Sequence, residues 1–305
     1  MLLLLFFAQA GFSGCWFRRP PTPPAPQFVA PPTQQSILDR INGSARIRQL
    51  QAESATISVP GLFVPLQANL AVERPRRMRL QGSVLGAGGV DLGSNDELFW
   101  MWTSLERPPA VYYARHDDFQ RSAAAQMFPF RPEWLIEALG IVSIDPRYPV
   151  EGPYPRGAGQ LEIRTRAPGV TGELTKILVV DATYGWVLEQ YLYDDRGELL
   201  AQASMSEHRY YSDVDVSLPH HVEIALPQSR ATIRVDISGY LINQLHGDPE
   251  QLWSLPRIEG AALVDIINSG NSPLLGQPPA AAAQHSDYGT LPTAARPQYR
   301  GFPGR

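Results

Sequence analysis

Most of the chain between residues 45 and 238 consists of short stretches in which apolar and polar side chains alternate. The clearest is 232–238, where Ile233, Val235 and Ile237 alternate with polar residues. Successive side chains of a β-strand point to opposite faces of a sheet, so this period of two indicates strands with one apolar face. Such a chain folds as a sheet whose apolar face other elements must cover.

We predict ten or eleven strands in one sheet. They are 45–59, 62–72, 76–85, 98–103, 110–115, 160–166, 174–181, 186–193, 199–209, 222–226 and 232–238. The turn Asp194-Asp195-Arg196-Gly197 is typical of a hairpin. The strands do not alternate with helices as in a parallel sheet, which favours a mainly β (α+β) fold with antiparallel pairing.

Three stretches predict helices instead. Residues 34–43 carry aliphatic side chains at helical spacing, and 118–127 includes a run of alanines. Residues 132–140 begin with proline and end with glycine, as helices often do. Trp134 would lie on the apolar face of this last helix.

The strands together offer one wide apolar face. With Trp134, its members are our candidates for lining a hydrophobic cavity: Met78, Leu80, Leu98, Trp100, Trp102, Val222, Ile224, Ile233, Val235 and Ile237. A pair of short helices cannot cover a sheet of this width completely. Either the sheet closes into a tight core or a hydrophobic cavity remains, and the sequence leaves both open.

The first fifteen residues form a unit of their own. An apolar run ends in Phe12-Ser13-Gly14-Cys15, which resembles the lipobox of bacterial lipoproteins, with residues 1–14 as the signal peptide. The run is shorter than the about 20 residues that a membrane-spanning helix needs. Cys15 is the only cysteine, and acylation, palmitate included, would account for it. The alternative is an ordinary secretory signal with an incidental cysteine.

Proline-rich segments flank the predicted domain. Seven prolines fall within residues 18–33, which indicates an extended tether behind the anchor; a ligand for an SH3-like groove is the alternative. We therefore divide the chain into a signal peptide (1–14), a lipidated cysteine with its tether (15–33), a β domain (34–257) and a mostly disordered tail (258–305) rich in proline and alanine.

Charge and motif spacing argue against several functions. The formal net charge is -4 with no basic cluster, which argues against a nucleic-acid partner. His220 and His221 are neighbours that a strand would turn to opposite faces, and no other histidines have the spacing of a metal site. Residues 86–89 lack the spacing of a dinucleotide-binding loop. With no nucleophile motif either, we predict no cofactor, no metal and no enzymatic activity.

The order of elements is similar to that of the LolA/LolB superfamily of outer-membrane lipoprotein carriers and receptors. The similarity covers about residues 34–242 and is carried by 79–86, 96–102 and 132–140. It implies an incomplete β-barrel with helices as a lid over a hydrophobic cavity that holds acyl chains. The lipid anchor makes the chain more similar to LolB, the anchored receptor, whose exposed apolar loop would correspond to Leu62 and Phe63.

The resemblance implies a membrane-anchored envelope lipoprotein that binds lipid or lipoprotein acyl chains during their trafficking. Trp16 stands where an Asp retains some lipoproteins at the inner membrane, so we expect an outer-membrane anchor with the domain facing the periplasm. The alternative is a non-enzymatic envelope scaffold that uses the same fold without a ligand and contacts other envelope proteins through its tails.

Overall fold

The computed structural model describes residues 24–59, 64–84, 88–122, 132–169 and 172–268. The chain divides into two units, Met1–Ser272 and Pro273–Arg305, and all described residues belong to the first. No helix within these described ranges is both long and apolar enough to cross a membrane.

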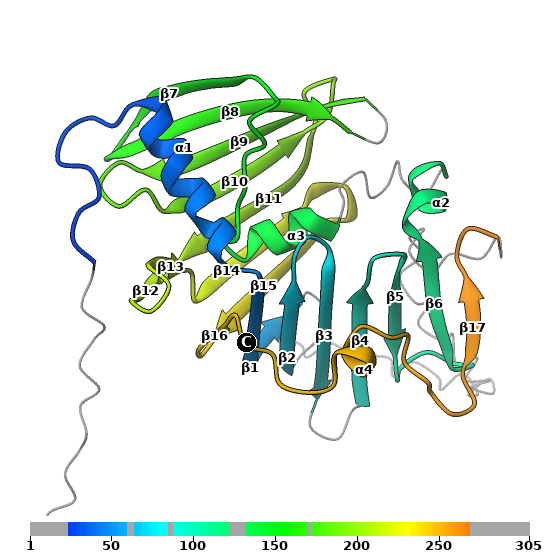
Figure 1. Ribbon diagram of the computed structural model, residues 1–305. Coiled ribbons are helices and arrows are strands. Elements are labelled where there is room, and N and C mark those ends of the chain that lie inside the picture. The colour runs from blue at the N-terminus through cyan, green and yellow to red at the C-terminus, as the bar shows by residue number, and fades with distance from the viewer. Residues whose placement is uncertain (1–23, 60–63, 85–87, 123–131, 170–171, 269–305) are drawn as a thin grey trace, which may run out of the picture. The chain divides into compact units, whose positions relative to one another are not determined.

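Among the described residues, fifteen strands form one sheet (Figure 1). Its order is β17-β6-β5-β4-β3-β2-β1-β15-β14-β11-β10-β9-β8-β7, and β16 also pairs with β1. The strands of this sheet are β1 (Gln49–Ser58), β2 (Leu66–Glu73), β3 (Arg77–Val84), β4 (Gly88–Ser94), β5 (Leu98–Thr103), β6 (Ala110–Arg115), β7 (Val150–Gly157), β8 (Gln160–Pro168), β9 (Glu173–Asp181), β10 (Val187–Tyr193), β11 (Leu199–Ser206), β14 (His221–Leu226), β15 (Ala231–Ile237), β16 (Leu241–Ile242) and β17 (Ala262–Asp265). Two short strands, β12 (Arg209–Tyr211) and β13 (Val216–Leu218), form a separate hairpin.

The predicted fold class is confirmed: the protein is mainly β, with one large curved sheet that does not close and few helices. The sheet has more strands than predicted, because segments without strand-like composition also pair. β4 begins with two glycines, and β7 contains Pro153 and Pro155. Glycine and proline are depleted in strands, so pairing with neighbours rather than local propensity forms these two.

The predicted helices 34–43 and 132–140 correspond to α1 (Gln34–Asn42) and α3 (Pro132–Ala138). The hydroxyl of Thr33 caps α1 by accepting a hydrogen bond from the backbone N–H of Ser36 at 3.2 Å. The predicted helix 118–127 starts earlier, as α2 (His116–Gln120), and its second half lies outside the described residues. Within the described ranges, three further short helical segments are η1 (Gly43–Arg46), η3 (Pro227–Ser229) and α4 (Pro249–Leu252).

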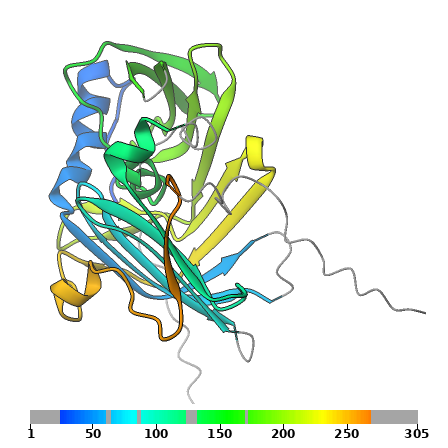
Figure 2. The ribbon, with the colours of Figure 1, turned by 90° about the vertical axis from the view of Figure 1, so that its right-hand side faces the viewer.

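Helices α1 and α3 pack on the same side of the sheet, which we call the inner face; the opposite side is the outer face. Figure 2 shows the green strands of β7–β10 and the cyan strands of β2–β5 on either side of α3. Ile37 and Ile41, one turn apart on α1, and Trp134 and Ile136 on α3 belong to one buried cluster with the strands. This cluster is the core of the domain.

The two edges of the sheet differ. At one edge, β7 carries two prolines and two register shifts against β8, which discourage pairing with another chain. At the other edge, β17 adds to β6 as a parallel strand, with Ala262 opposite Ala110. The folded domain therefore extends past the predicted boundary at residue 257. Four residues are too few for alternation to reveal a strand, so the sequence did not indicate β17.

A segment that we call the strap, residues 243–261, connects β16 to β17 and contains α4. It is bound to the outer face of the sheet. The guanidinium of Arg79 on β3 donates to the carbonyl oxygens of Gln251 at 2.6 Å and Leu252 at 3.1 Å. The side-chain amide of Asn95 donates to the carbonyl of Trp253 at 3.0 Å.

Candidate lipid-binding groove

The strand registers decide which face each predicted cavity residue occupies. Residues directly opposite one another in an antiparallel pair share a face. Eight candidates lie on the inner face or on α3: Met78, Leu80, Trp134, Val222, Ile224, Ile233, Val235 and Ile237. Cys15, Leu62 and Phe63 lie outside the described residues.

The remaining three candidates require a correction. Trp100 lies opposite Gly93, which lies opposite Arg79, and Arg79 is next to the inward-pointing Leu80. Trp100 is therefore on the outer face, and Leu98 and Trp102, two residues away on either side, share that face. The prediction placed them with Leu80 because β5 is apolar on both faces, so its alternation does not identify the inner one.

Trp100 belongs to a buried polar network that binds the outer face to the strap. Its indole nitrogen donates to Asp91 at 2.9 Å, and Asp91 also pairs with Arg79 at 2.8 Å. The ring lies against Gly93, where an added Cβ would be 2.0 Å from a ring carbon. These contacts give Trp100 a structural role.

Most inner-face candidates are packed in the core. Val222 is 0% exposed and Ile237 is 3% exposed, and both contact the buried cluster that includes α1 and α3. Met78, Leu80 and Ile233 lie at the margin of this cluster and are only partly buried. Under α1, then, the inner face is a tight core, and a larger open space lies to the side of it.

That space is a groove between α3 and the ends of β8, β9 and β10, which we call the α3 groove. It has a volume of about 370 Å³. Its apolar walls are formed by Trp134, Ile144, Ala167, Leu174 and Leu192. A second hollow, of about 570 Å³, adjoins it and shares Tyr148, Thr165, Ala167, Pro168 and Gly169. Ligand pockets typically measure about 300–1,000 Å³.

One buried ion pair lies within the α3 groove. The ammonium of Lys176 on β9 donates to the carboxylate of Glu137 on α3 at 2.6 Å, and the amide of Gln190 donates to the same oxygen at 3.1 Å. The Lys176 side chain is 21% exposed and that of Glu137 12%. Lys176 lies opposite Leu192 and Thr165 on the inner face. The other cation of the groove lining, Arg147, is paired with Asp145 at 2.6 Å and its side chain is exposed.

Sequence analysis did not single out Lys176, although two signals were present. It is the only lysine in the chain, and all the other residues among the 26 Lys and Arg are arginines. It also shares a strand face with Leu174, Leu178 and Val180, so the alternation already turns a charge toward the apolar side. A charge at such a position needs a partner, and Glu137 supplies it.

One ion pair and one charge–charge interaction restrain α3 over the groove. The carboxylate of Glu133 pairs with Arg76 at 3.2 Å, at the turn between β2 and β3. Arg74, on the same turn, is half-buried; burial lowers the pKa of its guanidinium, and the charge of Glu137 raises it. Both acidic side chains of α3 thus face cations of the sheet.

The arrangement suits binding. Apolar walls accept a hydrocarbon chain, and Lys176 keeps donors beyond the one that it gives to Glu137, so a polar end can be bound beside it. Within the described part of the chain, no three His, Cys, Asp or Glu side chains gather as a metal site.

Comparison with known proteins gives a likeness of fold. No protein-family model and no curated protein sequence matches the chain. Among solved structures, it is similar to an outer membrane lipoprotein-sorting protein domain from Vibrio parahaemolyticus, with 13% identity, a TM-score of 0.45, and coverage of 69% of this chain and 92% of that one.

Two other structures are similar to about the same degree. A LolA superfamily protein from Nitrosomonas europaea has 13% identity and a TM-score of 0.44, with coverage of 73% of this chain and 98% of that one. A DUF1329 family protein from Desulfovibrio piger has 10% identity and a TM-score of 0.47, with coverage of 72% and 94%. The sequence indicated a resemblance to the LolA superfamily, and a solved structure of that superfamily is among those to which this chain is similar.

Proposed function

We propose that this protein binds the acyl chain of a lipid or lipoprotein in the α3 groove and does not act as an enzyme. The observation that carries the proposal is the groove itself, an open space on the inner face with apolar walls, a buried lysine–glutamate pair and a more exposed Asp145–Arg147 pair. Such a site matches an amphipathic ligand, whose chain contacts the walls and whose polar end lies near Lys176.

The affinity would come mainly from apolar burial. Removing apolar surface from water contributes about 25 cal/mol per Å², and an acyl chain offers such surface along its whole length. The site would therefore distinguish ligands by chain length more than by headgroup. Lys176 would add a hydrogen bond to a carboxylate, ester or phosphate oxygen.

We further propose that the protein acts at the bacterial envelope, held by an acylated Cys15 and the proline-rich tether, with the domain facing the periplasm. Two or three acyl chains on a cysteine hold a protein firmly on a membrane, whereas one does so only marginally. Mass spectrometry of the protein extracted from its native membrane tests both parts, the modified Cys15 and a noncovalent lipid.

The groove is tested by filling it. Ala167→Trp places a large ring in the space shared by the two hollows, whereas Ala225→Trp makes the same substitution on the outer face, because Ala225 is adjacent to the inward-pointing Ile224. We expect the first variant to bind a fluorescent fatty acid at least about tenfold more weakly, a change of about 1.4 kcal/mol, and the second to bind it as the unmodified protein does. Thermal melts confirm that both variants fold.

The only lysine provides an independent readout. An acetylating reagent modifies Lys176 and no other side-chain amine, and peptide mapping separates this product from the N-terminal one. A bound fatty acid is expected to slow the modification in the unmodified protein and not in Ala167→Trp. Equal binding by both tryptophan variants, together with unprotected Lys176, would show that the groove is not a lipid site.

A further inference from the structure

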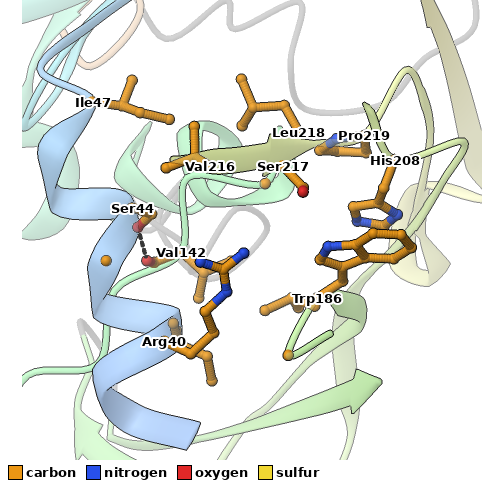
Figure 3. A pocket seen from close by; sticks show the side chains of 15 residues that line it. Arg40, Ser44, Ile47, Val142, Trp186, His208, Val216, Ser217, Leu218 and Pro219 are labelled. Atoms are coloured by element: carbon orange, nitrogen blue, oxygen red, sulfur yellow. Dashed lines mark hydrogen bonds between the residues drawn. The ribbon is translucent and has the colours of Figure 1, made fainter. Parts of the chain in front are cut away.

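A second, smaller cavity lies away from the α3 groove. It has a volume of about 50 Å³ and is enclosed by the end of α1, the turn before β10 and the β12–β13 hairpin (Figure 3). Its polar lining includes Arg40, Ser44, Trp186, His208 and Ser217. Its fifteen lining residues include an arginine and a histidine but no Asp or Glu.

Three groups in this cavity have hydrogen-bonding capacity that no described residue uses. The indole nitrogen of Trp186 and the hydroxyl of Ser217 are buried and have no partner within the described ranges. The Nε of Arg40 donates a hydrogen bond to the carbonyl oxygen of Tyr184 at 3.3 Å. The two terminal nitrogens of Arg40 form no hydrogen bond or ion pair with a described residue. In Figure 3 all three side chains point into the same space.

Leaving the indole nitrogen of Trp186 and the hydroxyl of Ser217 buried and unpaired is costly, and each calls for an explanation such as a water or an ion. A water needs about 10–15 Å³ of such a cavity. The cavity therefore has room for a few waters or for one group of the size of a carboxylate or phosphate. The charge of Arg40, with no carboxylate in the lining, favours an anion.

The surroundings hold these donors in place. Trp186 stacks between Tyr184 and His208, with ring centroids 4.4 Å and 4.9 Å apart. Gly185 has a φ of +68°, and a Cβ on it would lie 2.6 Å from Cγ of Arg40, so the close approach of the arginine needs glycine at this position.

A nearby carboxylate, that of Asp215, interacts with the charge of Arg40 but forms no ion pair with it. Asp215 lies outside the cavity lining and is already paired with Arg46 at 2.9 Å and with the hydroxyl of Tyr210 at 3.2 Å. His208 is neutral near pH 7, because burial lowers its pKa to about 4. The cavity thus has one fixed positive charge and two neutral donors.

We propose that this cavity is an oxyanion site, in which Arg40, Trp186 and Ser217 bind the oxygens of one carboxylate or phosphate group. The site is separate from the α3 groove and does not depend on acyl-chain binding there. The group can belong to a free anion or to the headgroup of a lipid, since the donors recognise only its oxygens.

The test uses the indole N–H signals of the ¹⁵N-labelled full chain, which has six tryptophans. Inorganic phosphate is titrated in one arm, and a short-chain lysophosphatidic acid below its micelle concentration in the other. The Trp186 signal, assigned with Trp186→Phe, is expected to shift while the other five serve as internal references. Arg40→Gln is expected to weaken the response at least about tenfold, because a charge-assisted bond is lost.

Arg48→Gln is the matched control, because it removes the same charge from an exposed position a few residues further on. A shift with inorganic phosphate identifies a free-anion site, and a shift only with the lipid identifies a headgroup site; both support the proposal. An unmoved Trp186 signal in both arms, or a response that Arg40→Gln leaves unchanged, overturns it and leaves ordered water in the cavity. The fold of each variant is checked from the five reference signals.

Discussion

The buried network on the outer face makes a quantitative prediction about stability. Asp91 accepts four hydrogen bonds, from Nε and a terminal nitrogen of Arg79 at 3.2 Å and 2.8 Å, from Gln81 at 3.0 Å and from Trp100 at 2.9 Å. The side chains of Arg79 and Asp91 are only 10% and 7% exposed. Asp91→Ala leaves the guanidinium and the indole N–H buried without this acceptor.

Breaking a buried ion pair by removing one partner costs about 3–5 kcal/mol. For a domain of this size, each kcal/mol lowers Tm by about 2–4 °C, so we expect a decrease of roughly 6–20 °C. The matched control is Asp96→Ala, which removes the partner of Arg77 from an ion pair whose side chains are 36% and 54% exposed. An exposed pair contributes about 0–1 kcal/mol, so this variant is expected to melt within a few degrees of the unmodified protein.

Thermal and guanidinium unfolding measure both variants, and hydrogen exchange reports on the strap. Because Arg79 also binds the carbonyls of Gln251 and Leu252, we expect faster exchange around α4 in Asp91→Ala than in Asp96→Ala. Replacing Arg79 and Asp91 together by leucine removes both charges and should recover part of the loss. Equal stability of the two alanine variants would refute the claim that burial makes this pair important.

Three further predictions follow from the sites. Burial lowers the pKa of His208 to about 4, below the about 6.5 of an unfolded chain, so the stability that depends on neutral His208 is complete above pH 6.5 and is lost as the pH falls toward 4. Guanidinium titrations near pH 7 and 4.5 should show a loss of up to about 3 kcal/mol that is smaller in His208→Gln, and equal losses would contradict this. Gly185→Ala should cost about 1–3 kcal/mol and displace Arg40, measurable as a lower Tm and a weaker phosphate response of the indole signals; an unchanged Tm would speak against the strained turn. Glu137→Gln removes the charge that holds Lys176, so acetylation of Lys176 should be faster by mass spectrometry, and an unchanged rate would show that the pair does not restrain the lysine.

Alternation in the sequence predicts the positions of strands better than it predicts which face of the sheet each side chain occupies. The bounds of β5 and β6 are those that the pattern predicted, because each is a continuous stretch between clear turns. The predicted face of Trp100 was wrong because β5 has large apolar side chains on both sides. Only the pairing with β4, a glycine-rich segment that has no strand pattern of its own, decides which side turns inward.

The candidate sites show the same limit. A lysine on the apolar side of a strand can be seen in the sequence, but its partner Glu137 is 39 positions away on α3. The oxyanion cavity joins Arg40 of α1 to Ser217 of β13, and neither position has a pattern that links it to the other. Such groupings arise from tertiary packing, which single-sequence patterns do not encode.

The strap has a mechanical consequence for the sheet. It starts at β16, which pairs with β1, ends at β17 on the β6 edge, and is bound midway by Arg79 and Asn95. The strap is attached to the sheet at both ends and in the middle. Bending of the sheet between β1 and β6 would change the distances between these attachment points, so the strap restrains it. We expect these strands to move together as one rigid unit. Any movement that admits an acyl chain must then come from α3 and the hairpins of β7 to β10, at the end of the sheet that the strap does not reach.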